Sequence, residues 1–164
     1  MSISLIPFFA AAQLQPAAIF SHNMLLQRQQ PIHIWGKGVP GKQVSVTFLH
    51  TKKTVIAKAD SSWDVYFPKQ EANTIPQSII IVSGKEKIQF NNILLGDIWL
   101  CIGQSNMEWS YYNGTSDIAA DFPTAFNKNI RLFHVPKAAS NFPQEDVKAN
   151  WTACDSNTIK SFSS

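Results

Sequence analysis

Short stretches in which apolar and polar residues alternate constrain the fold of this chain most strongly. Every second side chain is apolar between Val44 and Phe48, and again between Trp63 and Phe67. This period of two is typical of β-strands with one buried face. Further short strands are expected at three more apolar stretches, which are residues 32–36, 79–82 and 88–90. Turn-forming residues separate them, so an antiparallel β-sandwich is predicted for residues 15–95.

A fully apolar run, residues 98–102, begins the second part of the chain. Such a run is typical of a strand that is buried on both faces. Gly103 allows a sharp turn after it, and Ser105 follows two residues later. Open α/β sheets place their chemistry at the carboxyl ends of their strands. Ser105 is therefore a candidate nucleophile.

The residues after this run predict the beginning of an α/β domain. A short helix is expected within residues 117–126, a second strand over residues 130–135, and loop from residue 137 to Ile159. A βαβ unit needs roughly 30 residues. Residues 96–164 are thus expected to form an incomplete α/β domain.

Charge and composition exclude several functions. The net charge of +3 is small and its lysines are scattered, so a nucleic-acid partner is not expected. Cys101 and Cys154 lack histidines at zinc-ligand spacing, so no metal or other cofactor is expected, and whether they form a disulfide stays open.

The amino-terminal segment is apolar. Residues 1–14 are too short to span a bilayer and end in small residues, as a secretory signal does. They lack the positively charged leader of such a signal, so the alternatives are a signal remnant and an ordinary hydrophobic terminus.

The sequence offers no convincing catalytic base for Ser105. Three of its histidines fall in the β part, where surface or edge-strand roles are expected, and the fourth follows the second expected strand: His22, His33, His50 and His134. Asp97 precedes the apolar run and lies at its opposite end from Ser105, while Glu108 is expected to be a turn partner or solvated. The G-x-S-x-G elbow of α/β-hydrolases is also not met, because Met107 replaces its second glycine.

Residue identity around Ser105 nevertheless resembles a known enzyme family. Gly103-Gln104-Ser105-Asn106-Met107, preceded by Gly96 to Cys101, resembles the first signature block of the sialate O-acetylesterase family of SGNH hydrolases. The resemblance extends over residues 19–28, 31, 34–36, 129–133, 135–136, 151, 154 and 162–163. It implies a β-sandwich amino-terminal domain, residues 15–95, followed by the start of a flavodoxin-like SGNH hydrolase domain, residues 96–164.

The resemblance also implies the chemistry. In that family a serine attacks an acetyl ester on a sugar hydroxyl, and water then releases the acyl-enzyme without a metal or other cofactor. Ser105 would be the nucleophile and, through its backbone N–H, one oxyanion donor. The family's remaining oxyanion donors and its Asp and His come from later blocks that have no counterpart here, so this chain is expected to be an inactive fragment on its own.

Substrate contacts and location follow from the same resemblance. Candidate substrate-binding residues are Gln104, Asn106, Trp109 and Tyr111, with aromatic rings suited to sugar stacking. Trp99, inside the expected strand, is predicted to pack in the core. The favoured substrate is O-acetylated sialic acid, for a secreted or periplasmic carboxylic ester hydrolase. The alternatives are an acetylxylan-type esterase and a non-catalytic carbohydrate-binding or interaction module.

Overall fold

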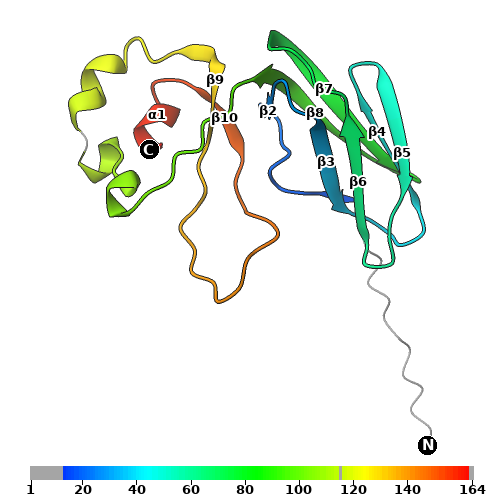
Figure 1. Cartoon of the computed structure of the whole chain (residues 1–164). Coiled ribbons are helices and arrows are strands. Elements are labelled where there is room, and N and C mark those ends of the chain that lie inside the picture. Colours follow the sequence, from blue (N-terminus) through cyan, green and yellow to red (C-terminus); the bar gives the residue numbers. More distant parts are fainter. Residues whose placement is uncertain (1–12, 115, 163–164) are drawn as a thin grey trace, which may run out of the picture.

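The computed structural model describes residues 13–114 and 116–162 and shows a chain built mostly from β-strands (Figure 1). Eight strands form two sheets, one of three strands in the order β1-β3-β6 and one of five in the order β2-β8-β7-β4-β5. Their bounds are β1 Gln15–Pro16, β2 Leu25–Gln27, β3 Ile32–Lys37, β4 Gln43–Phe48, β5 Thr51–Ile56, β6 Ser62–Phe67, β7 Asn73–Ser83 and β8 Glu86–Gly96.

The strands expected from the alternating pattern are present as β3, β4, β6, β7 and β8. The five-stranded sheet is mixed, however, because β2 pairs with β8 in parallel, and the expectation of purely antiparallel strands was wrong at this edge. Sequence analysis also missed β5, whose residues Thr51–Ile56 are mostly exposed and polar. Only Val55 of this edge strand is partly buried against the core, and a single such residue gives no alternating signal.

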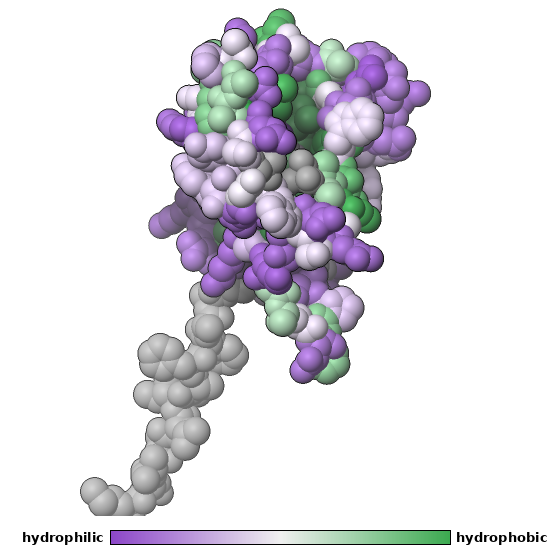
Figure 2. All heavy atoms as spheres, turned by 90° about the vertical axis from the view of Figure 1, so that its left-hand side faces the viewer, coloured by the Kyte–Doolittle hydropathy of each residue, from purple (hydrophilic) through white to green (hydrophobic). Residues whose placement is uncertain are grey.

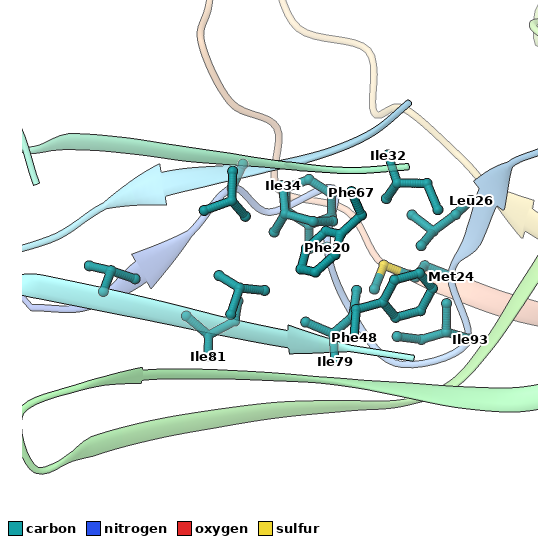
Figure 3. Packing of buried hydrophobic residues seen from close by; sticks show 14 of the residues in the cluster. Phe20, Met24, Leu26, Ile32, Ile34, Phe48, Phe67, Ile79, Ile81 and Ile93 are labelled. Atoms are coloured by element: carbon teal, nitrogen blue, oxygen red, sulfur yellow. The ribbon is translucent and has the colours of Figure 1, made fainter. Parts of the chain in front are cut away.

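The alternating side chains of both sheets share one hydrophobic core (Figure 3). Ile34 and Phe67 come from the three-stranded sheet, and Phe48, Ile79 and Ile93 from the five-stranded sheet. The last three are at most 1% exposed. Burial of apolar area at about 25 cal/mol per Å² makes this core the main source of stability.

The backbones of β1 and β3 lie close together at Gly36. A Cβ atom on Gly36 would overlap the carbonyl oxygen of Gln15 and lie 2.7 Å from Cα of Pro16. It would also lie 2.8 Å from the indole of Trp63. Any side chain at position 36 would therefore push β1 away from β3.

Residues 97–162 form a second part beside the sheets (Figure 1). It contains β9 (Asn127–Phe133) and β10 (Trp151–Cys154), three short 3-10 helices and α1 (Thr158–Ser161). The 3-10 helices are η1 (Ser105–Glu108), η2 (Tyr111–Asn113) and η3 (Ser116–Asp121). The second strand was predicted correctly as β9, but β9 pairs antiparallel with β10, which lies in the segment expected to be loop. The helix expected within residues 117–126 corresponds to η3.

Trp151 of β10 ties this part to the sheets. Its indole N–H donates a hydrogen bond to the carbonyl oxygen of Ile19 at 2.8 Å, and its ring centroid lies 5.1 Å from that of Phe133. Trp151 is only 9% exposed and belongs to the shared core. A single tryptophan thus connects the β9–β10 hairpin to the residues before β2.

Residues 98–102 differ most from expectation. They form no strand, and no described strand forms a sheet with them. Trp99 is 87% exposed and Leu100 79%, so the predictions of a buried strand and of Trp99 in the core were wrong. An apolar run becomes a buried strand only where neighbouring strands and a covering layer receive it, and the described residues provide neither.

The structure also bears on the two cysteines and on the amino-terminal segment. Cys101 is exposed and Cys154 is buried, and both are free thiols. Burial and the nearby Asp155 carboxylate raise the pKa of the Cys154 thiol. In the part of the chain that the structure describes, no helix is long and apolar enough to cross a membrane. The expected signal remnant falls largely on residues 1–12, outside the described residues.

Candidate active site

Ser105 lies on the surface, at the first residue of η1. It follows the extended segment 97–104, and the two residues beside it, Gln104 and Asn106, are exposed as well. The turn is closed by the backbone N–H of Met107, which donates to the carbonyl oxygen of Gln104 at 2.9 Å. The hydroxyl of Ser105 is thus presented outside the packed core, where a substrate has access to it.

Gly103 permits the tight turn that precedes Ser105. A Cβ atom at this position would overlap Cγ of Met107. Met107 thus folds back over the glycine and occupies the space beside the turn. A larger residue at position 103 would require the side chain of Met107 to move.

The two aromatic candidates sit in different surroundings. Trp109 is 53% exposed, and a Cβ atom on Gly114 would lie 3.1 Å from its indole, so the ring packs against this glycine. Tyr111 is half-buried, with its ring edge-to-face with Phe122 at 4.8 Å between centroids. The indole of Trp109 has the larger free area of the two for stacking on a sugar ring.

The two carboxylates nearest to Ser105 in sequence are held by cations. Asp97 accepts a hydrogen bond from Nε of Arg28 at 2.8 Å, and Glu108 pairs with Nζ of Lys137 at 2.7 Å. Within residues 13–114 and 116–162, no side chain makes a hydrogen bond to the hydroxyl of Ser105. Neither carboxylate therefore occupies the place of a general base.

The four histidines lie in other surroundings. Nδ1 of His22 accepts from the backbone N–H of Asn91 at 3.2 Å, and the ring of His33 stacks on Tyr66. His50 is exposed at the turn after β4, and the ring of His134 lies 6.4 Å from that of Phe162. The described residues also contain no cluster of three or more His, Cys, Asp or Glu side chains that could hold a metal ion.

The start of the segment that leads to Ser105 is anchored to β2 and the residue after it. Besides the Arg28–Asp97 pair, the backbone N–H of Ile98 donates to Oε1 of Gln27 at 2.8 Å. The hydrogen bond from Arg28 lowers the pKa of Asp97. The anchor is thus complete above the ordinary pKa of an aspartate and is lost as the pH falls through the lowered value.

Replacing Asp97 with asparagine is expected to loosen this anchor. The backbone N–H of Ile98 should then exchange with solvent about two- to fivefold faster, because an exposed ion pair contributes little. The matched control is Asp60→Asn, which removes a carboxylate that hydrogen-bonds Ser62 within its own turn. Hydrogen exchange followed by NMR checks the prediction, and equal Ile98 exchange in both variants would contradict it.

Sequence analysis did not find the residues that hold this segment. Arg28 and Gln27 lie 69 and 71 residues from their partners, and Lys137 lies far from Glu108 in the chain. No local pattern signals such pairs.

Comparison with known proteins identifies relatives of this chain. No family model matches it. It is 29% identical over 147 residues to the sialate O-acetylesterases of Pongo abelii and of Homo sapiens, and 27% identical over 145 residues to that of Mus musculus. The first two matches cover 81% of this chain and 27% of each relative. The chain therefore spans about a quarter of the length of the curated relatives it matches.

A solved structure supports the same relationship. The fold matches the crystal structure of a carbohydrate acetylesterase from Xanthomonas citri with a TM-score of 0.82 and 30% identity. That match covers 92% of this chain and 34% of the solved chain. The resemblance expected from the residues around Ser105 is thereby confirmed: the chain is homologous to the sialate O-acetylesterases.

Proposed function

We propose that this chain forms the nucleophile-bearing part of a carbohydrate esterase that removes O-acetyl groups from sialic acid. The observation that carries the proposal is the exposed Ser105 at the start of η1, within a Gly103–Met107 sequence that resembles the sialate O-acetylesterase signature. The homology over 81% of the chain supports it.

The chemistry is an acyl transfer through Ser105. Its Oγ attacks the acetyl carbonyl carbon, the hydroxyl proton passes to a base, and the sugar oxygen leaves after accepting a proton. Water then attacks the acetyl-serine, so that acetate is released and the hydroxyl is restored. The backbone N–H of Ser105 is one proposed oxyanion donor, and each such donor is worth about 10²–10³ in rate.

The domain organisation belongs to the proposal. Residues 15–95 would be a β-sandwich domain, and residues 96–164 the first part of an SGNH hydrolase domain. The division is supported by the change at Gly96, where β8 ends and the extended segment toward Ser105 begins.

The polypeptide of residues 1–164 is proposed to be inactive on its own. A serine hydroxyl is a weak nucleophile until a base accepts its proton. In the described part of the chain, the carboxylates near Ser105 are paired with Arg28 and Lys137. The base and the remaining oxyanion donors would come from additional polypeptide, as the greater length of the relatives suggests.

The preference for sialic acid and a secreted or periplasmic location are proposals as well. The relatives are named for sialate, whereas the solved structure is named only as a carbohydrate acetylesterase. Stacking of the sugar on Trp109, with polar contacts from Gln104 and Asn106, would suit either substrate.

Acetate release separates the alternatives. The natural gene product, at whatever length it is made, is assayed on O-acetylated sialic acid and on acetylated xylan beside the polypeptide of residues 1–164. We expect the gene product to prefer the sialic acid ester and the short polypeptide to match buffer alone. Preference for acetylated xylan would instead indicate an acetylxylan-type esterase. Sugar binding without acetate release would favour the non-catalytic carbohydrate-binding module.

A further inference from the structure

A cavity lies where the five-stranded sheet meets the β9–β10 hairpin. Its volume is about 250 Å³, and its lining comes from the start of β7, from β8 and from both strands of the hairpin. The side chains that matter for its chemistry are Arg131, Lys128, Asn92, Asn129, Phe126 and Leu94. None of these is a member of the proposed esterase site.

Arg131 gives this cavity an uncompensated positive charge. The residue is 9% exposed, and its Nη2 donates to Oδ1 of Asn92 at 3.1 Å. Its Nε and Nη1 are covered and have no hydrogen-bond partner among the described residues, and no described carboxylate forms an ion pair with it. The amide of Asn92 accepts a hydrogen bond but cannot neutralise the charge.

A buried guanidinium without a counterion is costly. Burial lowers the pKa of Arg131, yet a guanidinium remains protonated in proteins. Buried charges are normally paired, because the protein replaces only part of the hydration that the charge loses. An anion in the adjacent cavity would supply the missing opposite charge.

The rest of the lining indicates which anion fits. Lys128 adds a second cation, and none of the described residues that line the cavity is acidic. Phe126 and Leu94 contribute apolar surface beside these polar groups. Apolar walls together with a cationic end suit an anion that carries a hydrocarbon body better than a fully hydrated inorganic ion. We propose that this cavity binds a small organic carboxylate, with the carboxylate beside Arg131 and Lys128.

Binding of butyrate tests the proposal directly. The probe is titrated into the ¹⁵N-labelled chain, with the neutral isostere butyramide and inorganic phosphate as comparison ligands. We expect butyrate to shift the NMR signals of Asn92, Asn129 and Arg131 and to bind more tightly than either comparison ligand. Equal binding of butyramide, or tighter binding of phosphate, would overturn the proposal.

Matched variants localise the effect. Arg131→Gln should weaken butyrate binding at least about tenfold, since it removes a charged partner, whereas Arg28→Gln should leave it unchanged. Lys128→Gln, at an exposed side chain, should weaken binding about two- to fivefold, and Lys148→Gln should not. If Arg131→Gln does not fold, the comparison of Lys128→Gln with Lys148→Gln tests the proposal instead. Unchanged binding in Lys128→Gln would then overturn the proposal.

The site is independent of the proposed esterase function. Ser105→Ala should bind butyrate as the natural chain does, because Ser105 does not line this cavity. Loss of butyrate binding in Ser105→Ala would contradict the assignment of the anion to the Arg131 cavity. A negative esterase assay would not change the outcome of the butyrate titration, so the two proposals can be refuted independently.

Discussion

Replacing Ser105 with alanine is expected to lower acetate release by the natural gene product at least about 10³-fold. Removal of a catalytic serine eliminates the acyl-enzyme route and leaves only the residual catalysis that oxyanion donors and substrate binding provide. Because Ser105 is exposed and outside the core, the variant should fold as the natural protein does. The measurement is the steady-state rate of acetate release from O-acetylated sialic acid.

The matched control is Ser116→Ala. Ser116 is an exposed serine at the start of η3, only eleven residues further along the chain. Its replacement should keep acetate release within about twofold of the natural rate, as surface substitutions usually do. A Ser105→Ala protein that retains more than a tenth of the natural rate would show that another group is the nucleophile.

Replacing Trp63 with alanine is expected to remove about 3–5 kcal/mol from the free energy of unfolding. Trp63 is 1% exposed on β6 and packs under Gly36 and Gly38. Its indole N–H also donates to the carbonyl oxygen of Lys37 at 2.9 Å, so the variant leaves a cavity and loses this hydrogen bond. A loss of this size is a large fraction of the stability of an ordinary domain.

Tyr66→Ala provides the control on the same strand. Tyr66 is 55% exposed on the opposite face of β6, where its ring stacks on His33. Its removal should lower the free energy of unfolding by about 1 kcal/mol or less. Urea denaturation followed by circular dichroism compares the two variants. Equal losses would mean that the core is not organised around Trp63 as the structure shows.

The strands of the sheets could be predicted because their signal is local. The alternation of Trp63, Val65 and Phe67 reflects the burial of one face of the strand. Each of the predicted strands shows this pattern within its own residues. The edge strand β5 shows no such pattern, since only Val55 of Thr51–Ile56 is partly buried against the core. The parallel pairing of β2 with β8 was also not predictable, because it joins residues about 70 positions apart.

The structures of residues 98–102 and of β10 could not be predicted from local sequence patterns. Residues 98–102 have the composition of a buried strand, but burial requires partners that the described residues do not supply. Likewise, β10 was missed because Trp151–Cys154 is short, and only its pairing with β9 makes it a strand.

The candidate site was predictable in one respect. Residue identity from Gly103 to Met107 predicts Ser105 as the nucleophile, and the structure places Ser105 at the surface after a segment that belongs to no helix or strand. The pairing of Glu108 with Lys137 and of Asp97 with Arg28 depends on folding of distant segments. Figure 2 looks onto the side of the molecule that carries β9, β10 and α1, and shows hydrophobic residues interspersed with hydrophilic ones on this face.

Trapping of the acetyl intermediate tests the central claim most directly. The natural gene product is mixed with O-acetylated sialic acid, quenched with acid during turnover, digested and analysed by mass spectrometry. The account predicts one acetyl group on the peptide that contains Ser105, and none on that peptide in Ser105→Ala. Acetate release with an acetyl group on a different residue would contradict the assignment of Ser105 as the nucleophile.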